Sequence, residues 1–175
     1  MRLALSPLCL ACVAAAPAAP PPTSPATLVA QATIALPDGS TIGTASIVAA
    51  GNRTRLAVAL RGLAPGVHGM HFHTSGKCSG QGFVEAGAHL NPAARQHGIH
   101  NPAGSHLGDL PNVTADAQGN VSAQFMLPAS TEDLNAALFD ADGTAIVIHA
   151  DRDDDATDPS GNSGARIACG VVMRG

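Results

Sequence analysis

The stretch LVAQATIALPDGSTIGTASIVAAGNRTRLAVALRG, residues 28–62, decides the class of fold that this chain adopts. The short polar segments PDGS and GN, which are typical of hairpin turns, separate three β-prone segments: 28–36, 41–50 and 53–62. In the third of these, Leu56, Val58 and Leu60 recur at every second position, so they share one face of a half-buried antiparallel strand. The first third of the chain therefore predicts an antiparallel sheet and shows no catalytic motif.

The rest of the chain continues the strand pattern but interrupts it with two long loops. Further strands are predicted within 63–73, on both sides of the DAQGN turn in 112–127, within 144–150 and within 170–173. TEDLNAALF, residues 131–139, predicts one short helical turn. The apolar rhythm disappears over 75–111 and again over 151–163, and loops of such length in a compact domain are usually functional. We expect a β-sandwich or barrel whose function is carried by its loops.

Composition limits the size of the core and the kind of partner. A chain of 175 residues with 13% charged residues, 19 Gly and 13 Pro is typical of one turn-rich domain. The chain contains four Phe and neither Tyr nor Trp, so a small core of aliphatic residues would benefit from a disulfide or a metal. The net charge is -4 and basic residues form no run, which argues against a nucleic-acid partner.

The N-terminus has the features of a secretory leader. Residues 1–19 combine a basic second residue, an apolar run and small residues suited to cleavage near Ala16 or Ala19. A membrane anchor or a buried first helix fits less well, because Ser6 and Pro7 leave a run well short of the roughly 20 residues that a span requires. We therefore expect a signal peptide and a periplasmic or otherwise exported protein.

The leader leaves a second processing route open. CLAC, ending at Cys12, is similar to a bacterial lipoprotein cleavage box, although Cys9 stands where such a box normally has leucine. Lipidation of Cys12 would hold the protein on a membrane, and without it no membrane partner is expected. The Pro- and Ala-rich residues 20–27 read as an extended linker, so the folded domain is expected to span 28–175.

Two cysteines remain once the leader is set aside. An exported domain with Cys78 and Cys169 as its only thiols is expected to form one disulfide, and two separate buried thiols are the alternative. A bridge closing so long a loop stabilises a fold by about 4 to 5 kcal/mol at most in the chain-entropy model.

Histidines are concentrated in one part of the chain. His71 and His73 lie two apart on a predicted strand, so their imidazoles share a face, where they either bind one metal ion or face solvent. The long loop then contributes a second set of candidates: His89, His97, His106 and Asp109. Three imidazoles and one carboxylate suit zinc, whereas His71, His73 and His149 offer imidazole-only ligation, which suits copper.

Six motifs, in order, carry a family resemblance from Gly66 to the C-terminus. They are GMHFH, AGAHLNP, ARQHG, HLGDLPNVTAD, VIHA and GNSGARIACGVV. In these motifs the chain resembles the copper/zinc superoxide dismutases, particularly their exported, periplasmic bacterial branch. The resemblance implies an all-β fold: an eight-stranded Greek-key β-sandwich or flattened barrel of immunoglobulin-like architecture, with long metal-binding and electrostatic loops.

The resemblance also implies a role for individual residues. The copper ligands would be His71, His73, His89 and His149, and the zinc ligands His89, His97, His106 and Asp109. His89 would bridge the two metals and take up and return a proton during turnover. Arg166 would stand beside copper and bind the anionic substrate, and Cys78 would be bonded to Cys169.

The resemblance is less definite for three other sites. Asp153 would hydrogen-bond ligands of both metals, but Asp151 and Asp154 are close competitors. His68 is expected to be a hydrogen-bonded packing residue, and His100 matches no ligand and is expected to be exposed.

The expected function is dismutation of superoxide by a copper ion cycling between Cu(II) and Cu(I), with a structural Zn(II). Two alternatives are a non-catalytic copper-buffering protein on the same fold and a structural exported domain, and Arg166 argues against both. The acidic segment DRDDDATD, residues 151–158, should slow the approach of an anion, and Lys77 either offsets this or is an ordinary surface residue. The sequence leaves open whether the protein is a monomer or a homodimer.

Overall fold

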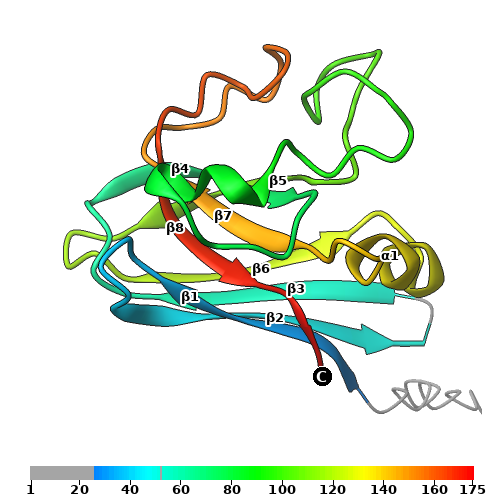
Figure 1. Cartoon of the computed structure of the whole chain (residues 1–175), viewed down its shortest axis with the longest axis horizontal. Helices are drawn as coiled ribbons and strands as arrows, with labels where there is room; N and C mark the ends of the chain where they lie inside the picture. Colours follow the sequence, from blue (N-terminus) through cyan, green and yellow to red (C-terminus); the bar gives the residue numbers. More distant parts are fainter. Residues whose placement is uncertain (1–25, 52) are drawn as a thin grey trace, which may run out of the picture.

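The computed structural model describes residues 26–51 and 53–175, which form a flattened β-barrel with two long loops at one side (Figure 1). The elements in chain order are β1 Thr27–Ala35, β2 Thr41–Ala50, β3 Arg53–Leu60, β4 Gly66–His73, the 3-10 helix η1 Gln81–Ala86, β5 Asp109–Ala115, β6 Val121–Leu127, α1 Thr131–Leu138, β7 Ala145–His149, β8 Arg166–Val171 and β9 Met173–Arg174. The predicted signal peptide and the candidate lipidation site Cys12 lie outside the described residues.

The strands are antiparallel and nearly close into a barrel. Their hydrogen-bonded order is β5-β4-β7-β8-β1-β2-β3-β6, and the two-residue β9 also pairs with β1. The ends of this order, β5 and β6, are consecutive in the chain and are joined by the turn at Asp116, which donates its backbone N–H to Asn120 O. Strands β4, β5 and β6 therefore lie side by side, with β3 next to β6. The next strand in the chain, β7, returns to pair with β4, and this order is a Greek key. The predicted eight-stranded Greek-key fold is confirmed, with β9 as a short addition.

The first three strands form as their sequence predicts. The β1–β2 turn is closed by Leu36 N–H donating to Ser40 O at 3.0 Å, with Gly39 at a φ of 84° that favours glycine. In β3, Leu56, Val58 and Leu60 are all buried, so the predicted apolar face is confirmed.

Strands β4 and β7 are buried on both faces, and this double burial places the functional residues. Met70 and Phe72 of β4 and Ile148 of β7 point into the barrel core. On the other face, Val147 of β7 belongs to a separate apolar cluster that packs under the loop after β4. Side chains on the outer face of this sheet are therefore enclosed by loops instead of facing solvent.

Two segments differ in extent from the sequence-based expectation. Asp109–Pro111, predicted as loop, begin strand β5, because Asp109 pairs with His71 and Leu110 with Met70 across the ladder to β4. The helical turn is a full eight-residue helix, α1, which Ser130 caps by accepting the backbone N–H of Asp133 at 3.1 Å. Among residues 26–51 and 53–175, no helix is long and apolar enough to cross a bilayer.

Candidate metal centre

Strand pairing brings distant histidines to one place on the outer face of the sheet. The β4–β7 ladder pairs His71 with Val147, and the β7–β8 ladder pairs His149 with Arg166. An isolated bridge pairs His73 with His89, which comes from the long loop. Because side chains alternate along each strand, His71, His73 and His149 all project to the loop-covered side.

One group consists of four buried imidazoles: His71, His73, His89 and His149. One ring nitrogen of each lies within 4.8 Å of the other three. These inward nitrogens include His71 Nδ1 and His149 Nε2, and each is a buried atom without a hydrogen-bond partner among the described residues. An unpaired buried polar atom is costly, and four in one place are accounted for by a metal ion that accepts their lone pairs. The donor set fits copper.

The outer nitrogen of each of these rings faces an oxygen. Asp153 Oδ2 lies 2.5 Å from His71 Nε2, Gly87 O lies 3.0 Å from His73 Nδ1, and Gly164 O lies 3.2 Å from His149 Nδ1. An acceptor at the outer nitrogen places the proton there and leaves the inner nitrogen with a free lone pair. The hydrogen bonding thus leaves the inward nitrogens of these rings able to bind a metal ion.

A second group is centred on the Asp109 carboxylate. Its Oδ1 atom lies 3.2 Å from His89 Nδ1, 2.9 Å from His97 Nδ1 and 3.1 Å from His106 Nδ1. A tetrahedron with metal–nitrogen bonds of 2.0 Å has edges of about 3.3 Å, so these separations fit a zinc shell. Asp109 Oδ2 is held in place by the backbone N–H groups of Gly98 and His106 at 2.8 and 2.9 Å. His89 belongs to both groups, with Nε2 facing the first and Nδ1 the second.

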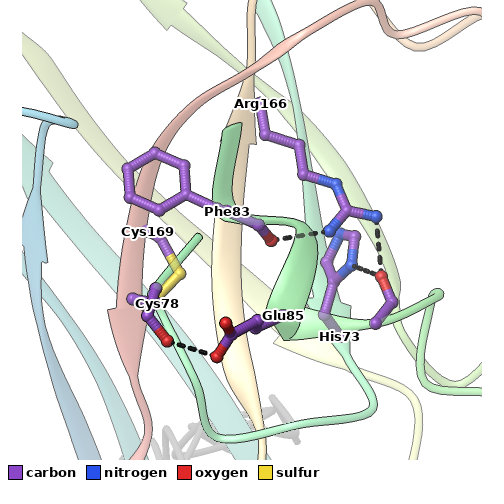
Figure 2. The surroundings of a disulfide bond; sticks show 8 residues. His73, Cys78, Phe83, Glu85, Arg166 and Cys169 are labelled. Atoms are coloured by element: carbon purple, nitrogen blue, oxygen red, sulfur yellow. Dashed lines mark hydrogen bonds between the residues drawn. A yellow bond between two sulfur atoms is a disulfide. The ribbon is translucent and has the colours of Figure 1, made fainter. Parts of the chain in front are cut away.

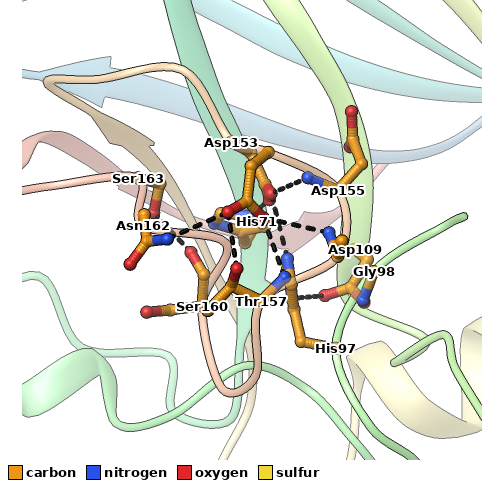
Figure 3. A network of polar contacts seen from close by, with 12 residues as sticks. His71, His97, Gly98, Asp109, Asp153, Asp155, Thr157, Ser160, Asn162 and Ser163 are labelled. Carbon is orange, nitrogen blue, oxygen red and sulfur yellow. Dashed lines mark hydrogen bonds and ion pairs between the residues drawn. The ribbon is translucent and has the colours of Figure 1, made fainter. Parts of the chain in front are cut away.

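Asp153 joins the two groups (Figure 3). Its Oδ2 contacts His71, and its Oδ1 lies 3.0 Å from His97 Nε2. Of its two competitors, Asp154 is exposed and contacts the loop residue Thr157, and Asp151 is exposed. The structure therefore places Asp153, and neither neighbour, between the two groups.

Asn112 is a site residue that sequence reasoning did not single out. Its side-chain amide donates to Asp153 O at 3.0 Å, and its side-chain oxygen accepts the Asp153 N–H at 2.9 Å. This two-point contact fixes the backbone of Asp153 against β5. The HLGDLPNVTAD motif contains Asn112, but nothing in the sequence indicates a partner 41 residues away.

The disulfide lies near the loop segment that contacts Arg166 and His73 (Figure 2). Cys78 and Cys169 are bonded, which confirms the predicted bridge between the long loop and β8. The loop segment after Cys78 presents two backbone carbonyls to the Arg166 guanidinium, which donates to Phe83 O at 2.8 Å and to Gly87 O at 2.6 Å. Gly87 O also faces His73 Nδ1, so one carbonyl orients both a candidate ligand and the arginine.

His68, His100 and Lys77 belong to neither group. His68 is buried, with Nδ1 2.9 Å from His149 O and Nε2 2.8 Å from Ala64 O, as expected of a packing residue. His100 and Lys77 are exposed. Two of the acidic residues in the 151–158 segment, Asp153 and Asp155, are buried in the loop.

Burial and charge separate the protonation behaviour of the histidines. Burial lowers the pKa of His71 to about 4, that of His149 to about 3 and that of His73 to about 2. His97 is also buried, but its contacts with Asp109 and Asp153 outweigh that effect and raise its pKa to about 10. Burial raises the pKa of Asp153 less than its hydrogen bonds with His71 and His97 lower it, so this carboxylate stays ionised.

These shifts predict that the metal-free protein is sensitive to acid. Below pH 6.5 the unfolded chain protonates His71, His73 and His149, whereas the folded chain keeps them neutral to about pH 4 or lower. Unfolding is therefore favoured as the pH falls from 6.5 to 4, by up to about 3 kcal/mol for a single group. Urea unfolding of the apo protein across this range measures the slope. The exposed His100→Ala variant should give the same profile, and a flat profile would contradict the prediction.

Comparisons with known proteins agree with the geometry. The family model for copper/zinc superoxide dismutase (SODC) matches residues 41–172. The chain is 42% identical over 147 residues to the superoxide dismutase [Cu-Zn] of Caulobacter vibrioides, covering 82% of this chain and 84% of that one. A SOD-like protein from Bacillus subtilis superposes with a TM-score of 0.77 at 34% identity, over 84% of this chain and 100% of that one. The Cu/Zn superoxide dismutase from Brucella abortus gives 0.66 at 30% identity, over 85% and 100%.

Proposed function

The chain belongs to the copper/zinc superoxide dismutase family, and from this membership we propose that it converts two superoxide anions and two protons to oxygen and hydrogen peroxide. The observation that carries the proposal is the set of four buried, unpaired imidazole nitrogens with an arginine on the adjoining strand. A copper-buffering protein would need the nitrogens but has no use for a guanidinium held beside them.

The proposed ligand sets follow the two groups. Copper would be held by His71, His73, His89 and His149. Zinc would be held by the residues gathered at the Asp109 carboxylate, namely His89, His97, His106 and Asp109 itself. When bound, copper supplies the one-electron chemistry by alternating between Cu(II) and Cu(I), and zinc fixes the orientation of the shared ring. The fit rests on donor type and on distances between ligand atoms.

Three residues of the chain carry the rest of the reaction. Arg166 keeps its positive charge near neutral pH and is only partly buried, so it can attract and orient a small anion. Its two carbonyl acceptors hold it in one direction. His89 supplies Nε2 as the atom that gains and returns a proton, while Nδ1 stays directed at the Asp109 group. Asp153 couples the two groups through His71 and His97.

We also propose that the protein works outside the cytoplasm. The Cys78–Cys169 disulfide supports this, because such bonds persist in oxidising compartments. Removal of residues 1–19 would release the domain as a soluble protein. Lipidation at Cys12 would instead attach it to a membrane. Mass spectrometry of the N-terminus of the mature protein, after cell fractionation, distinguishes the two routes.

The test of the proposed activity compares variants that affect different parts of the site. In protein loaded with copper and zinc, Arg166→Ile should retain copper and lose about a hundredfold in superoxide turnover, as when one stabilising donor is removed. Arg166→Lys, which keeps the charge, should lose less, and His71→Ala should lose both copper and activity. Tight copper binding by the wild-type protein without turnover would favour the copper-buffering function.

A further inference from the structure

His149 differs from the other histidines of its group in having two oxygens at its outer nitrogen. His149 Nδ1 lies 3.2 Å from Gly164 O and 3.1 Å from the hydroxyl oxygen of Ser163. The outer nitrogen of His73 has one such oxygen, Gly87 O. A side-chain hydroxyl therefore takes part in holding this ring.

The direction of the hydrogen bond between Ser163 and His149 follows from the other contact of the hydroxyl. Ser163 Oγ donates its only hydrogen to Ser160 O at 2.9 Å, so it faces His149 with a lone pair. His149 must then donate its Nδ1 hydrogen toward both Ser163 Oγ and Gly164 O. Ser163 and His149 are almost fully buried, with 1% and 3% of their surfaces exposed, so bulk water does not compete for this hydrogen bond.

The position of Ser163 is set by the sheet as well as by its own loop. A Cβ atom on Gly69 of β4 would come within 2.9 Å of Ser163 Cβ, so the serine occupies space that glycine leaves open. The Gly69 N–H donates to Asp151 O at 2.8 Å, and the Asp151 N–H donates to Ser163 O at 2.9 Å. These bonds pin the loop after β7 onto the strand that carries His71 and His73.

We propose that Ser163 is a positioning residue for the copper ligand His149. Its hydroxyl, with Gly164 O, holds the ring in the Nδ1–H tautomer and in one orientation. His149 Nε2 then presents its lone pair toward the inward nitrogens of the other three histidines of the first group. Acceptance of the Nδ1 hydrogen also makes Nε2 a stronger donor, because electron density shifts into the ring. The inference rests on the proposed function only in taking His149 as a copper ligand.

The first experiment needs no metal. Nitrogen-15 NMR of the metal-free protein reports which ring nitrogen of His149 carries hydrogen. Wild-type protein should show the Nδ1–H form alone, and Ser163→Ala should show a weakened Nδ1 hydrogen bond and a mixture of tautomers. Ser160→Ala is the matched control, because Ser160 takes part through its backbone oxygen. An unchanged His149 signal in Ser163→Ala would overturn the proposal.

The second experiment measures copper binding by competition with a chelator. Ser163→Ala should bind Cu(II) about tenfold more weakly, at the low end for loss of a partner of a metal-ligating histidine, because Gly164 O remains. Zinc affinity should not change, since His149 is not in the Asp109 group. The copper(II) EPR spectrum should shift as well.

A pair of variants of equal shape separates the hydroxyl from packing. Ser163→Thr keeps the hydroxyl and Ser163→Val does not, so Thr should bind copper more tightly than Val even if the extra methyl group weakens both. Equal affinities in this pair would contradict the proposal. Failure of wild-type protein to bind copper would instead refute the proposed function and leave the tautomer result standing.

Discussion

Replacing both Cys78 and Cys169 by serine is expected to lower the free energy of unfolding by up to about 4 to 5 kcal/mol, the upper figure of the chain-entropy model. The two cysteines are 91 residues apart in sequence, so the bridge removes much conformational freedom from the unfolded chain. The replacement also removes the covalent link between the loop segment that carries Phe83 and strand β8 of the folded chain. Denaturant unfolding of metal-free wild-type and double-serine protein measures the difference.

The same replacement is expected to reduce activity beyond any loss of copper. Without the bridge, the segment that carries Phe83 O and Gly87 O is free to move away from β8, and Arg166 loses its two acceptors. Turnover per bound copper should therefore fall, and Arg166→Ile should have a smaller effect in the double-serine background than in the wild type. Equal effects of Arg166→Ile in both backgrounds would show that the disulfide does not position the arginine.

Gly161→Ala is expected to break the contacts through which Asp153 joins the first group to the second. A Cβ atom at this position would lie on the Asp153 carboxylate and only 2.7 Å from His97 Nε2, so the carboxylate must leave its place between His71 and His97. The φ of 62° at Gly161 adds strain for any residue with a side chain. We expect affinity for both metals to fall by about 10- to 100-fold, as for other lost partners of ligating histidines.

A matched variant isolates the effect on Asp153 from the backbone strain. Gly51 has the same φ of 62°, but a Cβ atom there would meet nothing within 4 Å. Gly51→Ala should therefore lose about 1 kcal/mol of stability and retain both metals. Metal competition and unfolding measurements on the two variants make the comparison. If Gly161→Ala bound both metals like the wild type, Asp153 would not be needed where the structure places it.

Local patterns predicted most of the strand segments and the type of site. The alternation through Leu56, Val58 and Leu60 predicted a face that is buried in the barrel. The spacing of His71 and His73 predicted a shared face, because side chains alternate with a period of two along any strand. The loop start at Ser75 was close to the observed end of β4 at His73, but the assignment of Asp109 to the loop was wrong. Its place in β5 depends on pairing with His71, which no local pattern reports.

By itself, the sequence determined the antiparallel sheet, the family, the candidate ligands and the cysteine pair, because each of these depends on residue type and on spacing along the chain. Only the tertiary structure decided which nitrogen of each ring faces its group. It also decided that Asp153, among the three candidate aspartates, contacts His71 across 82 residues. It also revealed Asn112 and Ser163 as partners of the site. These contacts depend on how two loops pack over the outer face of β4 and β7, where buried polar atoms are paired across the loops or directed into one of the two groups. Such packing is set by long-range contacts that sequence spacing does not encode.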